Sequence, residues 1–158
     1  MERLIEQYCY HNMLYHNVLD GIRPEHMHVR INGLTNHMAW IAGNLPATRC
    51  KIAESLGVGL QQAFPEFYED NKAIMPDTEY PPLEELIKDW ERVTPVLEKR
   101  LGDLTQEELM AESPFQTPKI AHDNLLGTIA FLINREAYAI GQLSLMRKAF
   151  GYEAMKYS

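Results

Sequence analysis

The 158-residue sequence is poor in cysteine and has no long run of apolar residues. Its two cysteines, Cys9 and Cys50, form no C-x-x-C pair, so we expect neither a disulfide framework nor a zinc motif from them. A membrane-spanning helix needs about 20 predominantly apolar residues, and we expect no membrane insertion. The charged residues around Leu4 and Ile5 are not typical of a signal peptide. These features predict a cytoplasmic protein with free thiols.

An excess of basic residues is also missing. The sequence has 15 Lys and Arg residues against 22 Asp and Glu residues, a formal net charge of −7. Because an acidic surface repels phosphate backbones, we expect no nucleic-acid binding. Apolar residues make up 46% of the chain and charged residues 23%, which is typical of one globular domain spanning residues 1–158. No P-loop, nucleophile elbow or zinc-protease helix motif is present.

Strand signals are weak, whereas helix signals are strong. Apolar residues recur every three or four positions in four segments, and glycines that favour a left-handed cap follow them. The spacing predicts long helices over Glu2–Leu19, Thr35–Leu56, Leu83–Leu101 and Ile120–Phe150. A capping box that begins at Thr105 predicts a further short helix. Pro46 and Pro95 fall inside two of the long helices, where proline predicts a kink.

The segment from Val58 to Pro82 is a long, proline-containing connection, and we expect its aromatic residues to pack. Short connections favour antiparallel neighbours, so the first and second helices are predicted to run in opposite directions, as are the third and fourth. The long crossover lets the second and third run in the same direction. The predicted fold is therefore all-α: a four-helix bundle with up-down-down-up topology.

Polar residues on the inward faces of a bundle are candidates for function, because bundles hold ligands between facing helices. Trp40 and Trp90 are interpreted as core anchors. The inward stripe of the second helix is predicted to contain Ile41, Asn44 or Leu45, and Thr48, and that of the last helix Leu132, Arg135, Ala139, Gln142 and Met146. An inward Arg135 is unusual, because a buried guanidinium costs several kcal/mol unless it is paired.

Two stretches resemble a known family. Residues 36–45, read as NHMAWIAGNL, and residues 135–143, read as REAYAIGQL, are similar to the signature stretches of the DinB-like (YfiT-like) superfamily of putative metal-dependent hydrolases. The family patterns are W-x-x-G-H and H-E-x-Y-H-x-G-Q. Residues that match them are Trp40, Gly43, Glu136, Tyr138, Gly141 and Gln142. The resemblance implies a four-helix bundle with a long crossover, and a homodimer.

The three positions at which the family holds metal-binding histidines carry other residues here, namely Asn44, Arg135 and Ala139. Arginine has no lone pair to donate and alanine has no ligand atom. A single amide oxygen is a poor ligand for zinc or nickel. We therefore predict that the metal site of the family is absent from this chain.

Two interpretations of the former metal position remain open. Arg135 could stand in for the metal cation, so that a pocket of Asn44, Arg135, Ala139, Gln142, Tyr138 and His16 binds a small anion. Alternatively, Arg135 pairs with a carboxylate and only stabilises the bundle.

Three functional hypotheses follow from the sequence. The chain could bind a small anionic ligand at the former metal position, or it could act through protein interaction as a homodimer. The third hypothesis is a metal-dependent hydrolase or a low-molecular-weight-thiol transferase, for which histidines such as His11, His16 or His37 would have to rebuild a zinc or nickel site.

Overall fold

The computed structural model describes residues 2–69, 72–115 and 124–158. These ranges contain helices and connecting segments but no strand, and one isolated antiparallel bridge joins Glu112 to Asn124. The predicted all-α class is confirmed. The helices are α1 (Glu2–Leu19), α2 (Pro24–Met27), the 3-10 helix η1 (Ile31–Gly33), α3 (Met38–Ser55), α4 (Pro65–Tyr68), α5 (Leu83–Gly102), α6 (Gln106–Met110) and α7 (Leu125–Ala149).

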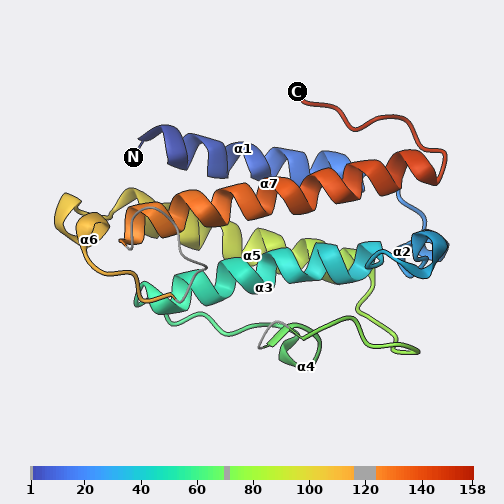
Figure 1. Cartoon of the computed structure of the whole chain (residues 1–158), viewed down its shortest axis with the longest axis horizontal. Helices are drawn as coiled ribbons and strands as arrows, with labels where there is room; N and C mark the ends of the chain where they lie inside the picture. The colour runs from blue at the N-terminus through green and yellow to red at the C-terminus, as the bar shows by residue number, and fades with distance from the viewer. Residues whose placement is uncertain (1, 70–71, 116–123) are drawn as a thin grey trace.

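Four long helices, α1, α3, α5 and α7, lie side by side (Figure 1). α3 packs most extensively against α5, and α1 against α7, while α1 also contacts α5 and α3 contacts α7. In Figure 1, α1 and α7 run from left to right, whereas α3 and α5 run from right to left. No helix in the described ranges combines the length and apolar character needed to cross a membrane.

The helix ends follow from local hydrogen bonding. The Thr105 side chain accepts a bond from the Glu108 backbone N–H and Glu108 bonds back, so the predicted capping box is confirmed. Asn124 caps α7 in the same manner by accepting from the N–H of Gly127. The predicted start of the last helix at Ile120 lies outside the described residues.

The second long helix begins three residues later than predicted. The Thr35 hydroxyl accepts a bond from the Ile31 backbone N–H, so it holds the preceding turn rather than the start of α3. His37 is the cap instead, and its Nδ1 accepts from the Trp40 N–H at 3.0 Å. Histidine is not among the usual cap residues, which is why the sequence pointed to Thr35.

The crossover between α3 and α5 contains the short helix α4 and packs along α3 (Figure 1). Tyr68 of α4 lies directly on Gly43 of α3, where a side-chain Cβ would come within 2.0 Å of the Tyr68 hydroxyl oxygen. That hydroxyl donates to the Ala39 carbonyl oxygen at 3.2 Å. A glycine at position 43 therefore permits this close contact, and the expected packing of the crossover aromatics is borne out by buried Tyr68 and Tyr80.

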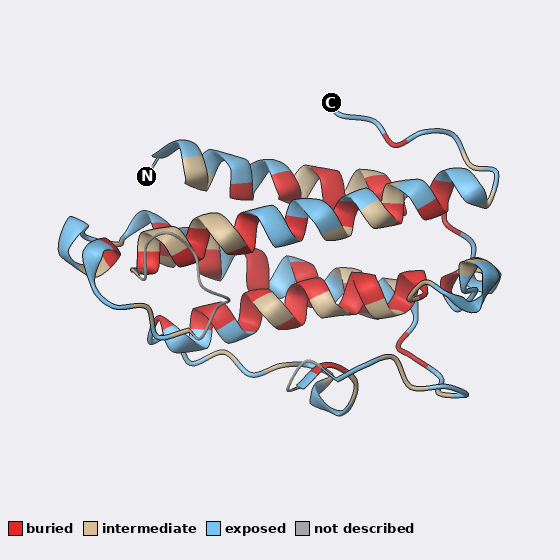
Figure 2. Cartoon of the chain, viewed as in Figure 1, coloured by how far each residue is buried: buried red, intermediate tan, exposed pale blue. Residues whose placement is uncertain are grey.

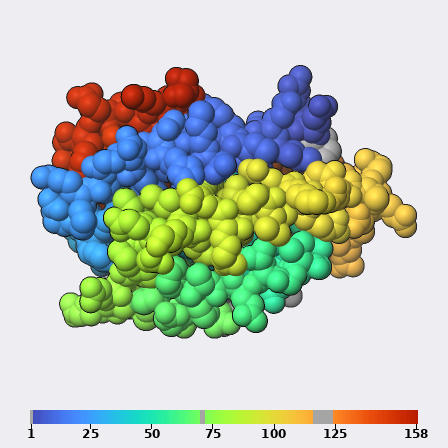
Figure 3. All heavy atoms as spheres, turned by 180° about the vertical axis from the view of Figure 1, so that it is seen from behind, coloured from blue at the N-terminus to red at the C-terminus, as the bar shows by residue number. Residues whose placement is uncertain are grey.

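The core fills the space between the long helices in two clusters (Figure 2). One surrounds Trp90, which stacks on Tyr15 with ring centroids 4.1 Å apart. The other gathers around Leu97 and Ile133 near the α6 end. Seen from behind, α5 lies between α1 and the crossover, and the C-terminal segment covers the end of α1 (Figure 3).

Candidate functional site

The signature stretch of α7 is turned differently from the sequence prediction. Arg135, expected to point inward, is exposed, whereas its neighbour Glu136 is only 5% exposed. A helix rotates by about 100° per residue. Shifting the inward stripe by one position therefore turns Glu136 into the bundle and Arg135 toward solvent. The inward positions at this level are Leu132, Ile133, Glu136 and Ile140.

Glu136 forms a two-pronged ion pair with Arg49 of α3. Arg49 Nε donates to Glu136 Oε2 at 2.9 Å, and Arg49 Nη2 donates to Oε1 at 2.6 Å. His11 of α1 places its Nδ1 3.1 Å from the same Oε1. Parallel donation from a planar guanidinium to both carboxylate oxygens is the strongest geometry for such a pair.

Arg49 is fully buried and contacts every long helix. Its guanidinium lies between two aromatic rings, 4.2 Å from the Tyr8 centroid and 3.8 Å from the Trp90 centroid. Its remaining donors reach the Thr94 hydroxyl at 2.9 Å and the Tyr8 carbonyl oxygen at 3.1 Å. We call Arg49, Glu136, His11, Thr94 and Tyr8 the central network.

The electrostatics of the central network favour the charged forms of Glu136 and Arg49 and the neutral form of Tyr8. Burial alone would raise the pKa of Glu136, but the Arg49 charge and the hydrogen bonds from Arg49 and His11 outweigh it, and the pKa lies below its ordinary value. Burial likewise disfavours the charged form of Arg49, but Glu136 outweighs it and raises the Arg49 pKa. Burial, followed by the Glu136 charge, raises the pKa of the Tyr8 phenol far above its ordinary value. The network is therefore a paired structural element with its charges committed to one another.

The six residues of the predicted anion pocket do not form one enclosed site. Arg135 and Tyr138 are exposed, while Asn44, Ala139, Gln142 and His16 are half-buried. His16 belongs to α1, whose main neighbours are α7 and α5. Arg135 makes no ion pair with any residue of the described ranges. The buried, paired arginine that the sequence suggested exists, but it is Arg49.

The family's metal does not fit the residues present. The three corresponding positions are the half-buried Asn44 and Ala139 and the exposed Arg135, which together offer one amide oxygen. Over the parts of the chain that the structure describes, no three His, Cys, Asp or Glu side chains are grouped so that they could hold a metal ion.

The sequence interpretation missed Arg49, and it considered His11 only as a possible metal ligand and not as a partner of Glu136. A signal for Arg49 was available, because it lies four residues after Leu45 and three before Ile52, on the stripe that was assigned from those apolar residues. His11 similarly follows buried Tyr8 by three residues and precedes buried Tyr15 by four. Arg49 and His11 are polar residues at positions of an apolar stripe, which is the pattern expected of a buried ion pair.

No family model matches the chain, and a search of curated proteins finds no relative of it.

Proposed function

We propose that the protein is a divergent, metal-free DinB-like four-helix bundle with up-down-down-up topology that acts by binding another protein through the outward face of α7. The bundle assignment is supported by the side-by-side packing of the four long helices and by their directions in Figure 1. The family assignment rests on the two signature stretches.

The observation that carries the binding role is the exposure of two large apolar side chains on α7. Tyr138 is 72% exposed and Leu145 is 69% exposed. Gly141 lies between them, and a side chain there would meet nothing within 4 Å. Seven residues are nearly two helical turns, so Tyr138 and Leu145 lie on the same face. Exposed apolar residues grouped on one face favour an interaction surface.

A second copy of the chain is the occupant that this face fits best. Tyr138 precedes Gly141 by three residues and Leu145 follows it by four. In an antiparallel pair of α7 helices with the two-fold axis at Gly141, Tyr138 of each copy meets Leu145 of the other. The missing side chain of Gly141 allows the helices a close approach at the axis.

Binding of a small anion at Arg135 is less well supported. An exposed guanidinium is screened by water and salt, and the residues predicted to surround it do not enclose it. The metal-dependent hydrolase or thiol transferase alternative needs ligands that the three family positions do not supply.

The proposal is tested by sedimentation equilibrium of the wild-type chain and of the double variant Tyr138→Ser/Leu145→Ser. We expect a wild-type dimer and at least an approximately tenfold larger dissociation constant for the variant. The matched control is Leu34→Ser/Met110→Ser, which removes two exposed apolar side chains elsewhere and should leave the dimer intact. A wild-type monomer at about 100 µM would overturn the proposal.

The two-fold axis has its own test. In a Cys9→Ser background, which removes the exposed native thiol, Gly141→Cys should form an intermolecular disulfide under mild oxidation, because the two Cα atoms lie close together at the axis. Lys51→Cys, exposed on α3, should not. Equal cross-linking of both variants would contradict the antiparallel α7 arrangement.

A further inference from the structure

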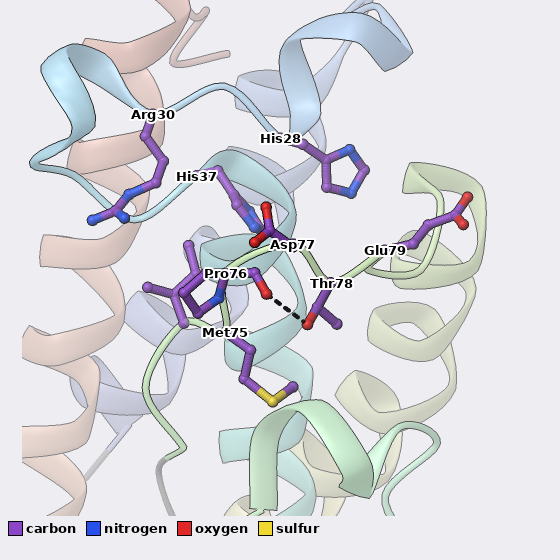
Figure 4. A pocket seen from close by; sticks show the side chains of 9 residues that line it. His28, Arg30, His37, Met75, Pro76, Asp77, Thr78 and Glu79 are labelled. Carbon is purple, nitrogen blue, oxygen red and sulfur yellow. Dashed lines mark hydrogen bonds between the residues drawn. The ribbon is translucent and has the colours of Figure 1, made fainter.

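A cleft of about 330 Å³ opens at the N-terminal end of α3 (Figure 4), and no residue of α7 lines it. One wall comes from the segment before α3 and carries His28, Arg30 and His37. The other wall comes from the crossover and carries Asp77 and Glu79. Volumes of this size are typical of sites for small molecules.

The two walls carry opposite charges that are not joined to each other. Among the described residues, no ion pair links Arg30 or His28 to Asp77 or Glu79. Arg30 Nε donates to the Thr35 carbonyl oxygen, and no hydrogen bond of its two Nη groups is found among the described residues. The only hydrogen bond that Figure 4 draws between the lining residues runs within the crossover, from the Thr78 hydroxyl to the Pro76 carbonyl oxygen at 3.2 Å. Elsewhere on the surface, charged neighbours do pair, as Lys99 and Asp103 do at 2.6 Å.

His37 adds an uncharged donor to the basic wall. Its side chain lines the cleft although the residue is only 4% exposed. Because Nδ1 accepts the Trp40 N–H, the neutral ring carries its proton on Nε2. None of the lining residues drawn in Figure 4 accepts a hydrogen bond from that ring. Burial, aided by the nearby His28, lowers the pKa of His37 to about 4, so the ring stays neutral near pH 7.

From these observations we infer that the cleft binds a small zwitterion of the amino-acid class. Its carboxylate lies toward Arg30 and His37, and its ammonium group lies toward Asp77 and Glu79. An anion alone would meet the carboxylates of the crossover wall, and a cation alone would meet Arg30. A ligand with both charges offers a hydrogen-bonding partner to each wall. Ile74 and Met75 also line the cleft and favour an apolar side chain.

The charge requirement is tested with three probes of one carbon skeleton, followed by backbone NMR shifts of residues 28–37 and 74–79. L-Leucine carries both charges, 4-methylpentanoate only the carboxylate, and 3-methylbutylamine only the ammonium group. We expect L-leucine to bind at least about tenfold more tightly than either analogue. No L-leucine shifts at about 10 mM, or equal affinity for 4-methylpentanoate, would overturn the inference.

Two variants test which residue contacts the carboxylate of the ligand and which contacts its ammonium group. Arg30→Gln should lower the affinity for L-leucine at least about tenfold and leave the affinity for 3-methylbutylamine unchanged. Asp77→Asn should lower L-leucine affinity similarly and leave 4-methylpentanoate no weaker. Asp77 has φ = 54°, a conformation that asparagine also tolerates, so this variant should keep the local backbone.

The matched control is Lys51→Gln, which removes an exposed positive charge from α3 outside the cleft and should bind L-leucine like the wild type. A loss in this control equal to that in Arg30→Gln would overturn the assignment of the carboxylate to Arg30. Zn²⁺ alone shifting the same residues, without L-leucine doing so, would overturn the zwitterion in favour of a metal held by His28 and His37.

Discussion

Arg49 with Glu136, in the middle of the long helices, and Arg30 with Asp77, at the N-terminal end of α3, are both sets of an arginine and a carboxylate. They differ in burial and in pairing. The first set is buried and joined by two hydrogen bonds, whereas the second is exposed and stands on opposite walls of a cleft. Burial forces charges to pair, because an isolated buried charge is very costly. Charges in contact with solvent can remain unpaired, and the unpaired charges of Arg30 and Asp77 are therefore available to a ligand.

The largest effect is expected from breaking the paired set. Glu136→Ala leaves buried Arg49 with only the more distant Glu98 carboxylate, 3.8 Å from its Nη1, and should lower the free energy of unfolding by about 3 kcal/mol, as measured by urea denaturation. The double variant Arg49→Met/Glu136→Leu should recover most of that loss, because apolar side chains replace the buried Arg49–Glu136 pair. As a control, Glu6→Ala breaks the exposed Arg3–Glu6 pair and should cost under about 1 kcal/mol. Equal losses of unfolding free energy in Glu136→Ala and Glu6→Ala would contradict the expectation that the buried pair stabilises the fold more than the exposed pair.

An effect of intermediate size on the free energy of unfolding is expected when His37 is protonated at low pH. This residue is buried but also lines the cleft. Its pKa of about 4 in the folded chain lies below the ordinary value of 6.5, so the unfolded chain binds the proton more readily. The stabilisation is therefore complete above about pH 6.5 and is lost as the pH falls toward 4. We expect a loss of about 1–2 kcal/mol over this window, reduced from the full shift because the ring borders solvent.

His37→Asn provides the matched variant, because asparagine can cap α3 without titrating in this range. Urea unfolding at several pH values should give a smaller decline between pH 6.5 and 4 than the wild type shows. The same decline in both proteins would mean that other groups cause it.

The smallest effect on the free energy of unfolding is expected from neutralising Arg30 or Asp77, which are not paired with each other. Arg30→Gln and Asp77→Asn should each change the free energy of unfolding by less than about 0.5 kcal/mol. L-Leucine at saturating concentration should raise the melting temperature of the wild type more than that of either variant, because stabilisation grows with the affinity of the folded chain for the ligand. Destabilisation by more than about 2 kcal/mol in either variant would mean that these charges hold the fold, as those of the central network do.

The sequence predicted the helices better than it predicted which way they face. Stop signals such as Gly57 and Gly151, and the capping box at Thr105, act locally and are therefore readable from the sequence. The orientation of α7 is not local. Its inward face is set by where Arg49 on α3 can reach a carboxylate, and one residue of rotation separates Glu136 from Arg135.

The cleft could not have been predicted from periodicity. Its walls come from irregular segments, residues 28–37 and 74–79, which no repeating pattern aligns with each other. They meet because the crossover returns along α3, with Tyr68 seated on Gly43. The glycine was visible in the sequence as a family match, but its physical partner lies in a segment 25 residues further along the chain.

The central network also has a consequence for the order in which the chain folds. Arg49 and Glu136 are 87 residues apart in sequence, and His11 and Glu136 are 125 apart. Closing loops of this length costs entropy that only late, long-range contacts repay. During synthesis, α1, α3 and α5 emerge before Glu136, and Arg49 then has only the more distant Glu98 carboxylate of α5, 3.8 Å from its Nη1. We therefore expect fragments that end before Glu136 to be less stable than the full chain.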